Sequence, residues 1–221
     1  MKKYIFILLL SICTSGIVQS QVISLKYYTK DNEETKKKKQ AHYSREISKK
    51  SNQKNFNVVE KYLNTDNFKL LGTSSDDKYL NFIGERREYY ENGNLLSEVT
   101  FSFDNKPIDT AKFFYENGTE RLKLLFPYDV QNNNTQVKDT LILQYIDDTG
   151  KAHIEDGNGF AVYEAFGDKI EGNVSNYKRE GDWKGKSETH KYSFTETYKD
   201  GKFVDGISID EKGKVDRKSV V

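Results

Sequence analysis

One short phrase of sequence is written twice in the middle of this chain. Residues 87–101 read REYYENGNLLSEVTF and residues 112–126 read KFFYENGTERLKLLF, so a shift of 25 positions superimposes two copies of Tyr-Glu-Asn-Gly. An Asn-Gly pair followed by an alternating apolar run is the strongest short-range signal of a β-hairpin. A repeat of this length predicts stacked units, none of which can bury its apolar face alone.

The residues after each Asn-Gly alternate with a period of two, which is typical of half-buried strands. In the first copy Leu95, Val99, Phe101 and Phe103 share one face. Pro107, which cannot donate to a strand ladder, is expected to close that strand.

The rest of the chain reads as looser copies of the same unit, because no window of helical length keeps a period of 3.6. The chain is therefore predicted to be all-β, with tandem antiparallel β-hairpin repeats stacked into an elongated, curved single-layer sheet. One helical turn capped by Thr35 is expected before Gln40. The predicted organisation is a signal peptide (1–20), an N-terminal strand and hairpin region (21–80), the hairpin repeats (81–130), a polar loop (131–140), a second repeat region (141–215) and a frayed tail (216–221).

The N-terminus has the three parts of a secretory signal peptide. Lys2 and Lys3 supply positive charge, residues 4–10 form a short apolar core, and small residues precede a cleavage site before Gln21. Cys13, the single cysteine, would leave with this segment, so the mature chain has no thiol for disulfide, metal or nucleophilic chemistry. We expect secretion across the inner membrane of a bacterium to the periplasm or the outer surface.

Charge and composition restrict the classes of partner. Removal of Lys2 and Lys3 from the 35 basic residues leaves 33 against 34 acidic ones, so no overall field favours nucleic acid or an anionic membrane. The apolar fraction is 35%, but 13% of residues are aromatic, which suits thin sheets carrying Tyr and Phe.

Four segments of this chain resemble the MORN-type repeats, and in particular the variant called YwqK-like after a toxin–antitoxin component. They are YYENGNLLSEVTF, FYENGTERLKLLF, REGDWKG at 179–185 and YKDGKFVDGISID at 198–210. The resemblance implies one β-hairpin per repeat and a stacked, elongated sheet. The segment at 26–47 also resembles the start of secreted, repeat-bearing bacterial proteins, some of which end in a TonB-type energy-transducing domain. No such domain is expected in this sequence, so energy transduction is not carried over.

Candidate catalytic and metal-binding patterns are better explained by structure. The sequence Asp148-Thr149-Gly150 matches an aspartic protease loop only superficially, because that chemistry needs two carboxylates and no second such loop exists. His42, His153 and His190 are far apart and have no metal-ligand spacing with carboxylates. No catalytic, cofactor-binding or metal-binding residues are predicted.

Aromatic residues recur near the predicted hairpins and carry the only predicted binding site. In one interpretation the rings stack between adjacent hairpins; in the other, some form a flat surface for a protein segment or a glycan. The predicted partner-binding residues are Tyr89, Tyr90, Tyr115, Trp183 and Tyr198.

The functional expectation is a secreted, non-enzymatic repeat scaffold that binds a protein partner in the bacterial envelope. Binding would use open strand edges or one sheet face. The alternative is a module that binds the membrane or an envelope polymer such as a glycan. An enzyme is the least favoured class, because no acid–base pair or nucleophile arrangement is visible.

Overall fold

The chain folds almost entirely into antiparallel β-strands, which confirms the predicted fold class. The computed structural model describes residues 20–128, 140–165, 167–187 and 191–219. Within them lie seventeen strands and one short 3-10 turn, η1 (Lys38–Gln40). The predicted signal peptide up to residue 19, most of the predicted polar loop and His190 lie outside the described residues.

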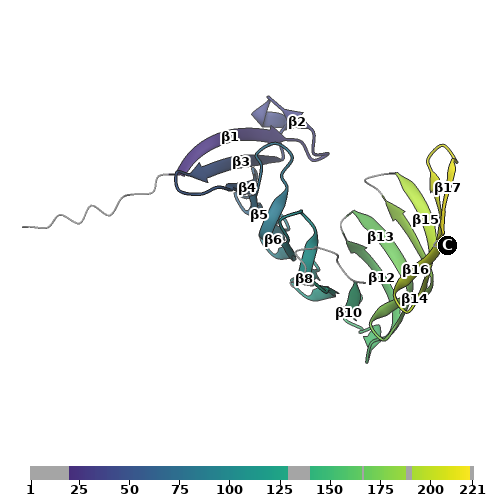
Figure 1. Ribbon diagram of the computed structural model, residues 1–221. Helices are drawn as coiled ribbons and strands as arrows, with labels where there is room; N and C mark the ends of the chain where they lie inside the picture. The colour runs from purple at the N-terminus through teal and green to yellow at the C-terminus, as the bar shows by residue number, and fades with distance from the viewer. Residues whose placement is uncertain (1–19, 129–139, 166, 188–190, 220–221) are drawn as a thin grey trace, which may run out of the picture.

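The first sheet contains ten strands, which follow the chain order except that β1 lies between β2 and β3. Every neighbouring pair is antiparallel, as expected for a series of hairpins (Figure 1). Its strands are β1 (Ser20–Tyr28), β2 (Glu34–Thr35), β3 (Tyr43–Lys50), β4 (Phe56–Tyr62), β5 (Phe68–Ser74), β6 (Phe82–Tyr89), β7 (Leu95–Phe101), β8 (Pro107–Phe114), β9 (Glu120–Phe126) and β10 (Leu141–Tyr145).

The second sheet contains seven strands in simple chain order, so the hairpins form two open sheets instead of one continuous sheet. The break falls after β10, where Ile146 and Ala152 form only an isolated bridge before the next strand. The strands of the second sheet are β11 (Ile154–Glu155), β12 (Asn158–Ala165), β13 (Asp168–Ser175), β14 (Lys178–Ser187), β15 (Tyr192–Lys199), β16 (Lys202–Asp210) and β17 (Val215–Ser219).

Six of the connecting turns share one hydrogen-bond pattern. The amide of the first residue donates to the carbonyl of the fifth, and the amide of the fourth donates back to the carbonyl of the first. The fourth residue has a positive φ, which is why it is Gly or Asn. These turns are Thr29–Glu33, Tyr90–Asn94, Ser102–Lys106, Tyr115–Thr119, Asp147–Lys151 and Asp210–Lys214.

Turn tyrosines join successive hairpins of the first sheet into a ladder. The hydroxyl of Tyr62 donates to the carbonyl of Tyr89 at 3.0 Å, and that of Tyr90 donates to the carbonyl of Phe114 at 2.8 Å. Tyr115 continues the series by donating to the carbonyl of Ile146 at 2.9 Å. In each step a tyrosine at one turn holds the residue that immediately precedes the next turn. The repeated Tyr-Glu-Asn-Gly phrase therefore links adjacent units as well as bending each one.

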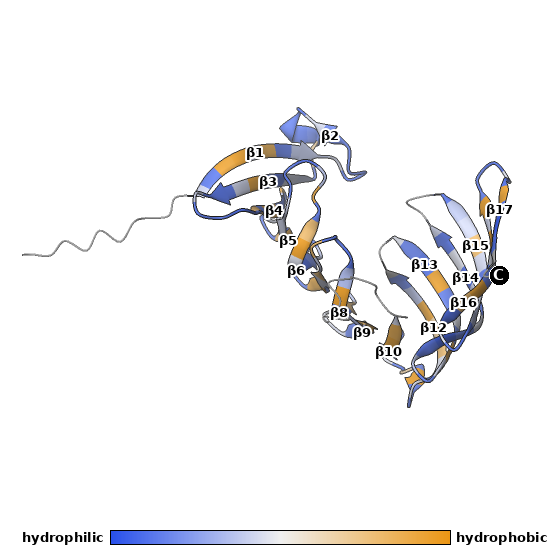
Figure 2. Cartoon of the chain, viewed as in Figure 1, coloured by the Kyte–Doolittle hydropathy of each residue, from blue (hydrophilic) through white to orange (hydrophobic). Residues whose placement is uncertain are grey.

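One apolar core extends through both sheets. In β9, for example, Leu122, Leu124 and Phe126 are buried and the residues between them are half-buried, which is the predicted alternation. Figure 2 shows that strands of both sheets carry hydrophobic residues. The cluster continues through Ile142 of β10 into Tyr163 and Trp183 of the second sheet. We call the face that carries these core residues the inner face of each sheet.

Two details of the predicted repeat are wrong. Pro107 begins β8 instead of closing the preceding strand, because the first residue of a strand is another position that needs no donor. Phe103 lies beyond the end of β7, in the turn at Ser102–Lys106, and is 89% exposed instead of sharing the inner face.

Two predictions for the terminal regions are also wrong. Thr35 does not cap a helix: it belongs to β2, and its hydroxyl accepts a hydrogen bond from the amide of Lys37, while η1 has no side-chain cap. The chain after Asp216 is not frayed up to Ser219, because it forms β17 and pairs with β16. The turn at Asp210–Lys214 reverses the chain so that β17 pairs with β16. The polar composition of residues 216–221 gave no indication of this pairing.

The tyrosine ladder predicts a measurable contribution to stability. Substitution Tyr115→Phe removes the hydroxyl and leaves the ring, so the free energy of unfolding should fall by about 0.5–1.5 kcal/mol in a urea titration. The matched control is Tyr79→Phe, since Tyr79 is 74% exposed. Equal unfolding midpoints for the two variants would show that the ladder contributes nothing.

Candidate binding groove

The inner face of the second sheet is built from two rows of directly opposed residues that cross its strands. Residues opposed in adjacent strands lie on the same face, so each row can be followed from the register. One row contains Tyr163, Ile170, Gly185, Phe194, Ser208 and Asp216; the other contains Ala161, Gly172, Trp183, Glu196, Gly206 and Lys218.

Each row changes character after β14. On β12 and β13 the residues of both rows belong to the core, except Gly172, which packs beneath the ring of Trp183. Trp183 itself, on β14, also belongs to the core. Strand β10 lies against this part of the sheet, contacting β11, β12 and β14. From β15 onward the residues of the same face are half-buried or exposed, apart from Gly206. The core-forming face therefore extends beyond the part of the sheet that β10 covers.

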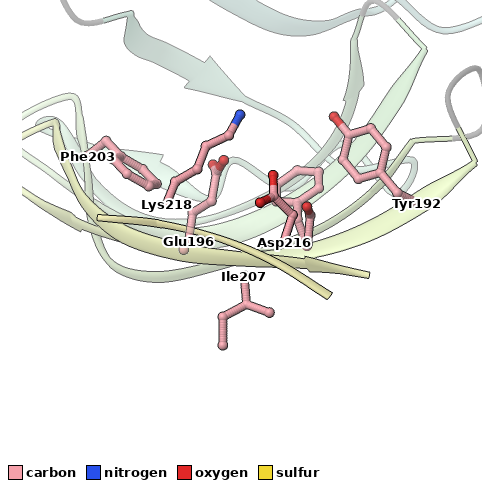
Figure 3. Close-up of a pocket in the computed structure, with 9 residues that line it drawn as sticks. Tyr192, Glu196, Phe203, Ile207, Asp216 and Lys218 are labelled. Atoms are coloured by element: carbon pink, nitrogen blue, oxygen red, sulfur yellow. The ribbon is translucent and has the colours of Figure 1, made fainter. Parts of the chain in front are cut away.

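A groove of about 230 Å³ lies on this uncovered part of the face. Figure 3 shows Tyr192, Glu196, Phe203, Asp216 and Lys218 rising from one side of the strands, with the side chain of Ile207 on the other side. The groove is lined by residues of β15, β16 and β17, namely Tyr192, Phe194, Glu196, Phe203, Gly206, Ile207, Ser208, Asp216 and Lys218.

Aromatic rings and charged groups are combined in this groove. The rings of Tyr192 and Phe194 are 5.8 Å apart. The Phe194 ring lies close over Gly185, where even a Cβ atom would approach it to 2.1 Å. A side chain at Gly185 would therefore displace the ring. Two carboxylates and one ammonium group complete the lining, so the groove can contact both apolar and charged groups of a ligand.

Arg179 fills the adjacent part of the inner face. Its guanidinium carbon is 5.0 Å from the centre of the Trp183 ring and 5.1 Å from that of the Tyr198 ring. It donates to the Tyr198 hydroxyl at 2.9 Å, and that hydroxyl donates to Glu196 at 2.7 Å. Burial, which disfavours the phenolate, is the main cause that raises the pKa of Tyr198 to about 12.

The structure places the five predicted partner-binding residues apart and gives most of them structural roles. Trp183 is 1% exposed, and its indole nitrogen donates to the carbonyl of Asn173, so it cannot form a contact surface. Tyr90 and Tyr115 use their hydroxyls in the turn ladder.

The other two predicted residues lie on different sheets. Tyr89 is half-buried against Phe68, with ring centres 6.5 Å apart, and its carbonyl accepts the Tyr62 hydroxyl. Tyr198 borders the groove through its contact with Phe203, at 6.0 Å between ring centres. Of the five residues, Tyr198 borders the groove, and Trp183, which is buried, lies directly opposite the groove residue Glu196.

Sequence reasoning missed most of the groove residues. The period of two in residues 190–198 puts Tyr192, Phe194 and Tyr198 on one face of a strand, but it gives no sign that this face is uncovered. Asp216 and Lys218 were missed because their segment was expected to fray. The signal that was available is the Lys212-Gly213 turn, which predicts that the chain reverses and pairs again.

Other candidate chemistry was also located. Asp147, next to the sequence that resembles a protease loop, contacts His153 at 2.7 Å and accepts hydrogen bonds from the Thr149 hydroxyl and from the Thr149 and Lys151 amides. These contacts, that with His153 above all, hold the pKa of its carboxyl below the usual range. This is turn chemistry, as predicted. Within the described ranges, no group of three or more His, Cys, Asp or Glu side chains could hold a metal ion, and no helix is both long and apolar enough to cross a membrane.

A second hollow, of about 990 Å³, lies on the first sheet near Phe103 and Ile108. Among the described residues, the only charged ones that line it are the acidic Glu85 and Asp104. The groove on the second sheet combines aromatic rings with groups of both charges and lies at an open strand edge, so it is the better candidate.

Comparison with known proteins does not assign the chain to a family. No family model matches it, and no curated protein matches it. The resemblance to MORN-type repeats stays a prediction.

The raised pKa of Tyr198 predicts how stability changes at high pH. An unfolded tyrosine ionises near pH 10, whereas the folded one does so near 12, so its contribution is complete below pH 10 and is lost as the pH rises towards 12. The variant Tyr198→Phe cannot ionise at this position, so its stability should fall less steeply over this range than that of the wild type. Urea titrations at pH 9, 10 and 11 measure this slope. A slope as steep as that of Tyr79→Phe would contradict the assignment.

Proposed function

We propose that this chain is a secreted, non-enzymatic repeat scaffold that binds a protein partner in the bacterial envelope. The observation that carries this proposal is that the inner face of the second sheet continues past the strands that β10 contacts. On β15–β17 most residues of this face are half-buried or exposed, and rings and charged groups line a groove there. Exposed apolar surface rimmed by polar groups is typical of sites where proteins bind one another.

The edge beside the groove supports a protein partner in particular. β17 is the last strand of the second sheet, and no other described strand lies against its outer side. An open edge offers backbone donors and acceptors to an extended segment, which pairs with it as an added strand. Such a segment would lie next to Asp216 and Lys218 and could place alternate side chains over the groove.

The proposed location rests on the sequence. The charged, apolar and small-residue parts at the N-terminus are those of a secretory signal peptide. The resemblance to MORN-type repeats of secreted bacterial proteins agrees with this location. An envelope polymer such as peptidoglycan is the second candidate ligand, because exposed aromatic rings can also pack against a glycan.

A single added side chain tests the groove. Ser208 lines it, so Ser208→Trp should block it, while Ile209→Trp places the same side chain on the opposite face of the same strand, where Ile209 is 42% exposed. Crosslinking in the native envelope followed by mass spectrometry should recover a partner with the wild type and with Ile209→Trp. Recovery should fall by about tenfold or more with Ser208→Trp, equivalent to about 1.4 kcal/mol of binding free energy.

Partner recovery that is the same for both variants would remove the groove from the proposal. Sedimentation of the purified protein with peptidoglycan tests the second candidate ligand, the envelope polymer. Co-sedimentation that Ser208→Trp abolishes, without any protein crosslink, would replace the protein partner with the polymer.

A further inference from the structure

Basic side chains on the inner faces repeatedly occupy the same kind of environment. Arg86 has its guanidinium carbon 5.1 Å from the Phe82 ring centre and 4.9 Å from that of Phe101, with a Glu88 carboxylate oxygen at 3.4 Å. Arg179 lies between the Trp183 and Tyr198 rings in the same way.

A third arginine, Arg45, shows the arrangement near the start of the chain. Its guanidinium carbon is 4.6 Å from the centre of the Tyr28 ring. Its Nε donates to the carboxylate of Glu60 at 2.6 Å. The carboxylate beside Arg179 is that of Glu196, at 3.9 Å. In all three cases a planar cation lies over at least one ring and beside a carboxylate, which is a favourable environment for a guanidinium group.

The groove contains the same parts on the same inner face. Tyr192, Phe194 and Phe203 supply rings, and Glu196 and Asp216 supply carboxylates. The arginine that would complete the arrangement is not among the residues that line the groove, whose single basic residue is Lys218 on the edge strand.

We propose that the groove is a subsite for an arginine side chain of an extended protein segment that adds to the open edge of β17. This inference rests on the proposed function and specifies its ligand. An added strand would lie about 4.8 Å from β17, so a long side chain on its inner face can extend over Asp216 towards the rings. Glu196 already accepts the Tyr198 hydroxyl and lies 3.9 Å from an Arg179 nitrogen, so a shorter or apolar side chain would leave Asp216 without a cationic partner.

Charge complementarity favours this occupant. Arg179 already pairs with Glu196 at 3.9 Å, so the carboxylate that a ligand cation would neutralise is that of Asp216, which has no ion pair among the described residues. A guanidinium group stays charged, stacks on rings and can bind a carboxylate with two parallel hydrogen bonds. Lys218 carries a positive charge in the same groove, so it should weaken binding of the arginine.

Three labelled peptides test the proposal by fluorescence anisotropy. All have the same length and alternate Thr with one other residue, which is Arg, its neutral isostere citrulline, or Glu. The wild-type protein should bind the Arg peptide about tenfold or more tighter than the citrulline peptide, the size expected for a desolvated cation–aromatic contact with a carboxylate. The Glu peptide should bind most weakly.

Variants assign this preference to the groove. The double substitution Glu196→Gln with Asp216→Asn should reduce the Arg preference to about twofold or less, and Lys218→Ala should increase affinity for the Arg peptide. The matched control, Glu171→Gln with Asp205→Asn, also removes two negative charges, but from the opposite face of the sheet. It should bind the peptides as the wild type does.

The outcomes distinguish this inference from the function on which it rests. Equal binding of the Arg and citrulline peptides, or failure of all three to bind, would overturn the arginine subsite and leave the crosslinking result for Ser208→Trp unaffected. An equal loss of preference in both double variants would also overturn it, because general charge attraction would then explain the preference. Loss of the groove-dependent crosslinks would instead overturn the proposed function.

Discussion

The structure depends on how a sheet one layer thick can bury its apolar face. A two-layer protein places a second sheet or helices over such a face. Here the two open sheets meet around β10, and their inner faces form one cluster in which Leu122 and Ile142 are fully buried. Because β10 lies where the sheets meet, it acts as the shared cover, and residues far from it in the sheet order lose that protection.

Charged side chains complete the cover where apolar ones are too few. Glu60 is 1% exposed, yet its carboxylate contacts Arg45 on one side and Lys69, at 2.7 Å, on the other. Burying a lone carboxylate would be costly, but two cations and hydrogen bonds offset its desolvation. The aliphatic stems of the basic residues also cover neighbouring rings, such as Tyr43 beneath Lys69. The inner face is thus a mixed surface on which rings and cations pair.

Local patterns in the sequence predicted the strands and turns but not how the sheets are covered. The alternation around Val99 and Leu124 identified buried positions correctly, because period and face are linked within a strand. Which part of the second sheet is covered depends on β10, which contacts β11, β12 and β14. These contacts join segments that are distant in the sequence, so they leave no local signal. For the same reason Trp183 was expected at a surface: its burial follows from Gly172 beneath it and Tyr163 beside it, at 6.3 Å between ring centres.

The location of the groove follows from the repeat architecture. In a stacked array each unit is stabilised by its neighbours, and among the described strands β17 has a neighbour, β16, on one side only. Open edges risk unselective pairing, and β17 limits this risk because it is short and carries Asp216, Arg217 and Lys218 in succession. Charges of both signs do not exclude every partner strand. A segment with complementary charges loses less free energy by desolvation on binding than a segment without them. The same residues that protect the edge can therefore select what binds there, and this coupling explains why the uncovered inner face and the charged edge occur together.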